Sequence, residues 1–293
     1  MKKKDNKKRN NIILYVALAS FLTFLGFFVY YFYEYRAWVR DGEIAQQNSD
    51  HMREIFTEQI DAFSVIIDNI VHSQGNDPTN EQPIITPPPI GDYENEQENG
   101  QLFLSALELA RISTNNNDII AYIHIPNTNL SNIIVQTYNN NFYLHHDINK
   151  ERNSNGAIFM DYRNSFDFSD QNTIIYGHNM RNGTMFHNIR YYMERDFFNN
   201  HPIITIITDE FIFIYQAFAA FSTMVDFYYI QVDFESNADF YALINEIKSR
   251  SNHPIPRIVN YNEQILILST CTNAHEDERF VLASVLINII QIP

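Results

Sequence analysis

Cys271 is the only cysteine among 293 residues. It ends an apolar, β-like run, Ile265–Cys271, and Arg279 follows after a short polar loop, where a further apolar run begins. Earlier in the chain the apolar run Thr173–Tyr176 leads through a glycine into His178. A thiol, a histidine and an arginine that each lie at the end of a β-like segment are the parts of a thiol acyl-transfer site.

Each of these three side chains has a chemical role in such a site. A thiol becomes a good nucleophile beside a base or a cation, and His178 is the best candidate for that base among ten histidines. Arg279 is always charged and could orient a substrate carbonyl or stabilise an oxyanion. The structural alternatives are that Cys271 is a buried small hydrophobe and that Arg279 is an ordinary surface residue.

The elements that must position these residues are mainly β-strands. Helices are expected at Leu102–Ile112 and Ala238–Arg250. The strands are separated by clusters of Asn, Asp, Gly and Pro, and they suggest a closed barrel or a sandwich. The last two are apolar on both faces, so they should be central or covered on each side. The expected strands are Ile119–Ile125, Ile133–Gln136, Ala157–Asp161, Thr173–Tyr176, Ile203–Thr208, Phe211–Phe221, Gln264–Cys271 and Arg279–Ile289.

The N-terminus predicts a membrane anchor. Six basic residues and a single acidic one, Asp5, precede an apolar run from Ile12 to Tyr33. As a helix, this run spans about 30 Å, the thickness of a bilayer core. The basic tail places the N-terminus in the cytoplasm and the bulk of the chain outside. A cleaved signal peptide is the alternative, but the run is long and the aromatic stretch after it is a poor cleavage site.

Charge and composition limit the remaining possibilities. A net charge of −15 argues against nucleic acid as a partner. An exported chain with one cysteine has no internal disulfide, so its thiol must be buried or used. Apolar spacing predicts an amphipathic helix from Glu43 to Val71 that could pack on the domain, lie on the membrane or pair with another copy. Residues 73–100 are rich in Asn, Gln, Glu and Pro, a composition that indicates a linker.

Several motifs resemble sortases of class B. Leu268-Ser269-Thr270-Cys271 with Arg279 resembles the signature Leu-x-Thr-Cys and the catalytic arginine of that family. Tyr176-Gly177-His178-Asn179-Met180 is similar to its histidine region, and residues 156–164 (GAIFMDYRN) match the segment upstream. The resemblance covers about Leu102 to Ile290, and the motifs are jointly highly specific.

The resemblance implies a mainly β fold: a closed eight-stranded sortase-type barrel with peripheral helices, preceded by a transmembrane helix. It implies a cysteine transpeptidase in which Cys271 is the nucleophile, His178 the general acid and base, and Arg279 the group that orients substrate and steadies the oxyanion. It implies no cofactor and no metal. By position, the substrate-binding residues are expected to be Asn140, Leu144, Tyr229, Ile230 and Ser269.

The expected organisation is a cytoplasmic tail (1–10), a transmembrane anchor (11–34), an amphipathic helical segment (35–72), a linker (73–100) and an extracellular catalytic domain (101–293). Its partners would be secreted proteins with a C-terminal sorting signal, an amine of peptidoglycan precursor or cross-bridge, and membrane lipid. The alternatives are a pilin-polymerising sortase and an anchored, non-catalytic binding module. A metal site at residues 275–278 is disfavoured, because adjacent residues rarely converge on one ion.

Overall fold

The computed structural model describes residues 2–73, 105–253, 259, 263–271 and 277–292. The chain divides into two compact units, Met1–Ile44 and Ala45–Pro293. The long helix α1, Lys2–Ser73, contributes to both. The linker expected at 73–100 and the loop at 272–276 lie almost entirely outside the described residues.

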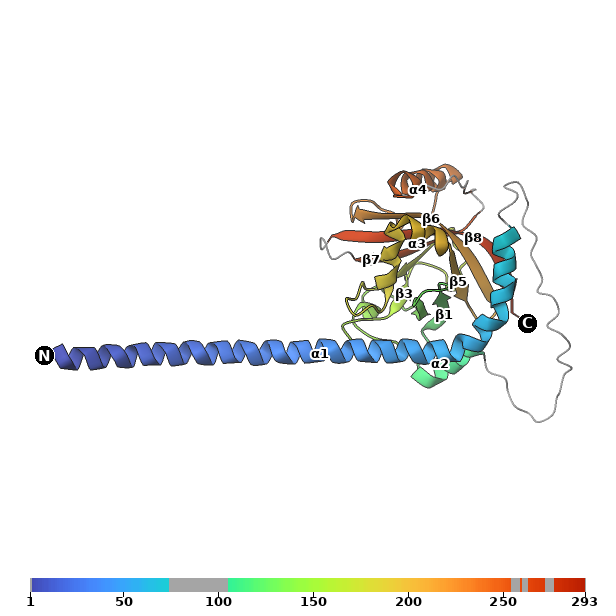
Figure 1. Cartoon of the computed structure of the whole chain (residues 1–293). Coiled ribbons are helices and arrows are strands. Elements are labelled where there is room, and N and C mark those ends of the chain that lie inside the picture. Colours follow the sequence, from blue (N-terminus) through green and yellow to red (C-terminus); the bar gives the residue numbers. More distant parts are fainter. Residues whose placement is uncertain (1, 74–104, 254–258, 260–262, 272–276, 293) are drawn as a thin grey trace, which may run out of the picture. The chain divides into compact units, whose positions relative to one another are not determined.

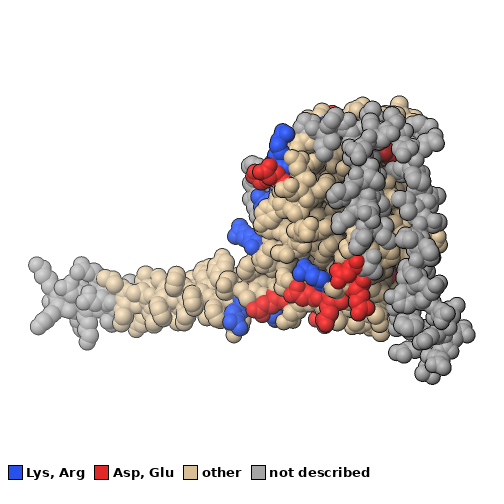
Figure 2. Space-filling model, turned by 45° about the vertical axis from the view of Figure 1, so that its right-hand side comes forward, with Lys and Arg blue, Asp and Glu red and all other residues tan. Residues whose placement is uncertain are grey.

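The first unit is the N-terminal part of α1. The sequence has no charged residue between Arg9 and Glu34, and Figure 2 shows no acidic or basic group on the described part of this stretch. Its apolar side chains are exposed, as they are at Leu14 and Phe24. Within the described residues, this is the one helix long and apolar enough to cross a membrane, a property that signal sequences share.

The second unit is built on a closed barrel. In the described part of the chain, eight strands follow one another around it in the order β1-β2-β3-β4-β7-β8-β6-β5. Figure 1 shows the strands gathered into one body, with α4 on the outside. Two neighbouring pairs are parallel, β2 with β3 and β4 with β7, and the other pairs are antiparallel. The strands are β1 (Ile119–His124), β2 (Ser131–Val135), β3 (Ile158–Met160), β4 (Asn172–Tyr176), β5 (Ile203–Ile207), β6 (Phe211–Met224), β7 (Ile265–Cys271) and β8 (Glu278–Gln291).

All eight expected strands are present, within a few residues of their expected ends. Side chains alternate between two faces along a strand, and β7 shows the result: Ile265 and Ile267 enter one hydrophobic cluster, while Leu266 and Leu268 enter the other. The prediction that this strand is covered on both faces is confirmed. Burial on both sides explains why its sequence does not alternate with polar residues.

Short helices surround the barrel. Serine caps begin two of them: α2 (Ala106–Thr114), where Ser105 accepts from a backbone N–H, and α4 (Asn237–Arg250), where Ser236 does the same. The helix expected at Leu102–Ile112 is therefore observed from Ala106. The other helices are the 3-10 helices η2 (Phe142–Leu144) and η3 (Phe186–Met193) and the helix α3 (Arg195–Asn200); η2 and α3 were not predicted.

The C-terminal part of α1 packs on the barrel. Of the three possibilities for the amphipathic helix, the structure shows this one, with Met52, Phe56, Phe63 and Ile67 buried in a core cluster. The ring of Phe56 stacks on Tyr122 of β1, with centroids 4.0 Å apart. This stretch of helix therefore belongs to the same compact unit as the strands.

Candidate active site

The sheet register brings the three predicted catalytic residues to one end of the barrel. In the parallel pair β4–β7, Tyr176 lies opposite Ser269, and both His178 and Cys271 follow two residues later. On the other side of β7, Cys271 is the register partner of Arg279 in β8. The backbone positions of the three residues therefore lie at the ends of three neighbouring strands.

His178 is held by backbone groups on two sides. Its Nε2 lies 2.9 Å from the carbonyl oxygen of Leu144, and its own carbonyl accepts a hydrogen bond from the Phe186 N–H at 2.9 Å. Because a carbonyl can only accept, Nε2 of His178 carries the proton in this contact. In the neutral ring Nδ1 is then the nitrogen with a lone pair for proton transfer.

Gly177 lets this loop lie close to the barrel. A Cβ atom at this position would come within 2.8 Å of the Phe186 ring and 3.2 Å of Ile158. Its N–H donates to the carbonyl of Ser269 at 3.2 Å, which extends the pairing of β4 and β7 toward His178. A glycine is required here by close packing.

Asp161, at the end of β3, is a hydrogen-bonding centre beneath the site. Its side chain is completely buried and accepts from Arg163, from the Tyr176 hydroxyl at 2.9 Å and from the Asn140 amide at 3.0 Å. Burial alone would raise the pKa of Asp161, but the hydrogen bonds from Arg163 and Tyr176 outweigh it and hold the pKa below its usual range. The carboxylate is therefore charged and stabilised by its neighbours.

Arg163 connects this carboxylate to the segment after β6. Its Nη1 donates to the Tyr228 hydroxyl at 2.8 Å, and Nη2 donates to the Ile230 carbonyl at 3.0 Å. Next to them the hydroxyls of Tyr229 and Ser269 lie 2.8 Å apart and are both buried. These contacts join three strand ends to the loop that holds Tyr228–Ile230.

The five residues expected to bind substrate have different environments. Asn140, Leu144 and Ile230 are half-buried, and the Asn140 oxygen also accepts from the Tyr162 N–H at 2.9 Å. Tyr229 and Ser269 are buried and hydrogen-bonded to each other, so they support the wall behind Ile230. All five belong to segments that meet at the end of the barrel where β4 and β7 end.

Sequence reasoning missed Asp161 and Arg163 as parts of this site. Two opposite charges two positions apart usually belong to a solvated turn. The only sequence signal for burial of Asp161 and Arg163 was the apolar strand that precedes them. Among the described residues, no group of three or more His, Cys, Asp or Glu side chains is placed to hold a metal ion.

Comparisons with known proteins agree with this fold. The family model for the sortase domain matches residues 123–287. Sortase B of Listeria monocytogenes is 36% identical over 172 residues, which cover 59% of this chain and 70% of that protein. Sortase B of Staphylococcus aureus is 32% identical over 176 residues, which cover 59% of this chain and 72% of that protein.

Solved structures give the same result. The Staphylococcus aureus sortase B–substrate complex aligns with a TM-score of 0.59 and 31% identity, covering 62% of this chain and 85% of that one. The X-ray structure of Clostridium perfringens sortase B aligns with a TM-score of 0.58 and 31% identity, covering 61% of this chain and 98% of that one.

The chain belongs to the sortase family, the cysteine transpeptidases of the cell wall. Within that family its relatives are sortases of class B.

Proposed function

We propose that this enzyme cleaves a C-terminal sorting motif of secreted proteins and joins them to an amine of the cell wall through a thioacyl-enzyme. The observation that carries the proposal is the placement of Cys271, His178 and Arg279 at the ends of adjacent strands. Residues on three segments can act on one carbonyl carbon only if the fold brings them to one place, and the register of β4, β7 and β8 supports that.

The first half-reaction forms the thioester. The Cys271 thiolate attacks the carbonyl carbon of the scissile peptide bond, and Arg279 steadies the resulting oxyanion. The carbon–nitrogen bond breaks as His178, protonated on Nδ1, gives that proton to the departing amine. The hydrogen bond from Nε2 to Leu144 fixes the ring so that Nδ1 is the atom that exchanges protons.

The second half-reaction releases the product. An incoming amine attacks the thioester carbon, and Nδ1 of His178 takes the proton from that amine. The new carbon–nitrogen bond replaces the carbon–sulfur bond, and the Cys271 thiolate leaves. Asn140, Leu144 and Ile230 form the wall against which the sorting peptide lies, and the buried Tyr229 and Ser269 support this wall from behind.

The apolar stretch of α1 would keep the enzyme at the cell membrane, with its N-terminus in the cytoplasm and the barrel outside. The basic tail before residue 10 and the absence of charge from Ile12 to Tyr33 support this orientation. Protease treatment of intact cells tests it: the barrel should be digested, and an epitope placed at Met1 should survive in the membrane fraction. Release of the whole protein into the medium would favour a cleaved signal instead.

The test of the chemistry begins with a peptide library and a set of amine acceptors. The full chain should cleave one class of peptide and accumulate a thioacyl adduct at Cys271, detected by mass spectrometry as hydroxylamine-labile. Cys271→Ala should abolish both, and Ser249→Ala, at an exposed position on α4, should keep the adduct. Cleavage that persists in Cys271→Ala would end the proposal. If a lysine side chain of another secreted subunit were the preferred acceptor, the enzyme would be a pilin-type polymerase.

A further inference from the structure

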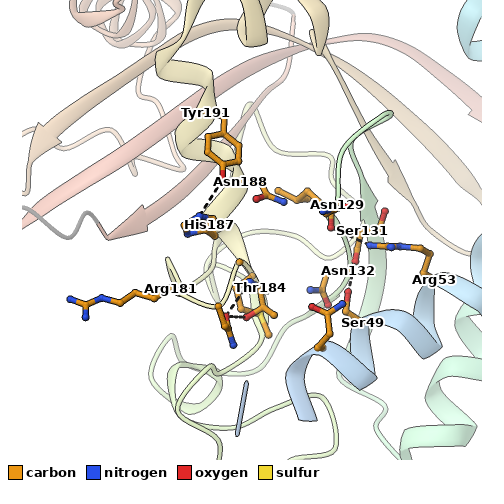
Figure 3. Close-up of a pocket in the computed structure, with 15 residues that line it drawn as sticks. Ser49, Arg53, Asn129, Ser131, Asn132, Arg181, Thr184, His187, Asn188 and Tyr191 are labelled. Carbon is orange, nitrogen blue, oxygen red and sulfur yellow. Dashed lines mark hydrogen bonds between the residues drawn. The ribbon is translucent and has the colours of Figure 1, made fainter. Parts of the chain in front are cut away.

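A second feature at this end of the barrel is a polar cavity of about 410 Å³. Three segments form its walls: residues 46–53 of α1, residues 129–132 at the start of β2, and residues 181–191, which span the loop after His178 and most of η3. Figure 3 shows labelled side chains of these segments around one space, with the Arg181 guanidinium pointing away from it. We refer to this space as the polar cavity.

The lining of the polar cavity contrasts with the rest of the chain. The protein has 35 acidic residues, yet none of the described residues that line the cavity is Asp or Glu. Its walls carry carboxamides, hydroxyls, the imidazole of His187 and the guanidinium of Arg53. Such a lining favours a ligand rich in amides and hydroxyls that is neutral or negatively charged.

One side chain in the cavity has an unused donor. Asn132 is only 9% exposed, and its oxygen accepts from the Ile133 N–H at 3.1 Å. Among the residues that the structure describes, its NH₂ group has no hydrogen-bond partner. Thr184, across the cavity, donates to Asn182 at 2.7 Å. The NH₂ group is open to the solvent of the cavity, so it can donate to water or to a ligand that enters there.

The cavity is at the catalytic end of the barrel. Ile134 of β2 is the register partner of Ile158 in β3, and the next residue of β3, Phe159, is the partner of Tyr176 at the end of β4. The start of β2 therefore lies beyond the end of β4, where the chain continues into His178. The loop from His178 to Phe186, closed by a backbone hydrogen bond, separates the histidine from the cavity.

We infer that the polar cavity binds the sugar–peptide part of the acceptor, whose free amine attacks the thioester; this inference rests on the proposed function. N-acetylated sugars and stem peptides present the hydroxyls, amides and carboxylates that this lining can bind. Asn132 would donate to an acetamido or peptide carbonyl, and Arg53 would pair with a stem-peptide carboxylate. The loop that carries His178 would thus contact the acceptor on one face and hold the base on the other.

The test separates the two half-reactions in the full chain. Asn132→Ala and Asn188→Ala are compared with Asn245→Ala, an exposed asparagine on α4. Cleavage of the sorting peptide with water as the acceptor should stay within twofold of the parent in all three. With a soluble disaccharide–stem peptide that carries its cross-bridge amine, KM should rise at least tenfold in the two cavity variants and not in Asn245→Ala.

Shorter acceptors identify what the cavity recognises. A bare diglycine amine, which carries neither sugar nor stem peptide, should react equally with all variants. The lipid-linked precursor and the soluble disaccharide–peptide share the same headgroup. An equal rise in KM for both acceptors in the cavity variants would assign the contact to that headgroup. A rise in KM for the lipid-linked precursor alone would assign the contact to the lipid carrier and overturn the inference.

Two other results would also overturn it. One is an unchanged KM for the disaccharide–peptide in both cavity variants. The other is a rise in KM for the sorting peptide, which would assign the cavity to the donor. Failure of the proposed function itself would look different, because no thioacyl adduct would then form on Cys271 in the parent protein.

Discussion

Arg163 holds Asp161 through two atoms of its guanidinium: Nε lies 2.8 Å from one carboxylate oxygen, and Nη2 lies 2.7 Å from the other. The same Nη2 also donates to the Ile230 carbonyl. One planar group thus joins the end of β3 to the loop after β6. This fork geometry is available to arginine and not to lysine.

Replacement of Arg163 should loosen the proposed peptide-binding wall. In Arg163→Lys we expect KM for the sorting peptide to rise about tenfold with a smaller change in kcat, because one ammonium cannot hold Asp161 and Ile230 together. In Arg163→Gln the buried carboxylate loses its charge partner, so the free energy of unfolding should fall by about 2–4 kcal/mol. Steady-state kinetics and urea unfolding measure the two effects.

The control for that variant is Glu246→Gln, which removes an exposed ion pair with Arg250 on α4. Such a pair contributes only about 0.3–0.5 kcal/mol. If Arg163→Gln were no more destabilising than this control, the pair with Asp161 would not support the site.

The stacking of Phe56 on Tyr122 joins the C-terminal part of α1 to the barrel. Phe56 is fully buried, so Phe56→Ala should lower the free energy of unfolding by about 3–5 kcal/mol through lost burial and the resulting cavity. Denaturant titration of the barrel checks this, with the exposed Glu58→Ala as the control. Equal stability of the two variants would mean that the helix packs only loosely.

The close packing at Gly177 predicts a sensitive position. Gly177→Ala would push a methyl group against the Phe186 ring, and overpacking of this kind costs about 1–3 kcal/mol. Because His178 is the next residue, we expect peptide cleavage to fall about 100-fold. The same substitution at Gly26, where no atom lies within 4 Å of the added Cβ, is the control and should leave cleavage unchanged.

The half-buried His124 of β1 predicts a pH dependence of stability. Burial lowers the pKa of His124 from 6.5 to about 4, and the charge of Arg53 adds to the effect. As the pH falls, His124 therefore binds its proton at a higher pH in the unfolded chain than in the folded protein. The free energy of unfolding should decrease from about pH 6.5 down to about pH 4, by about 3 kcal/mol at most, and this contribution should level off below that pH.

His124→Asn should remove the change of unfolding free energy with pH between pH 6.5 and pH 4. It should leave the dependence between pH 7.5 and 8.5 unchanged. Denaturant titrations across this range measure both. A variant that kept the parental slope below pH 6.5 would show that another group causes it.

The strands could be predicted because their signals are local. Runs such as Ile265–Leu268 are apolar with a β-branched residue at every second position, and turn residues delimit them. The mixed sequences of η3 and α3 have no such periodicity, because buried residues such as Phe186 and Phe198 are spaced among polar ones. Cys271, His178 and Arg279 could be singled out because each lies at the end of a β-like segment, and the motif resemblance then assigned each of them a role.

The contacts between distant segments could not be predicted. Asp161 and Arg163 look like a solvated pair until Tyr228 and Ile230 are placed above them. Asn132 looks like a turn residue until α1 and the loop after His178 close a cavity around it. Such roles depend on tertiary neighbours far away in the chain, and one sequence does not encode them as a local pattern.

The parallel pairing of β4 with β7 has a consequence for timing. In the chain β5, β6 and α4 separate these two strands, so a large loop must close before the imidazole and the thiol can meet. Contacts of this range form slowly and late in folding. Because β7 and β8 follow β1–β6 in the chain, the residues proposed to catalyse the reaction can come together only after this pair of strands has docked on β4 and β6.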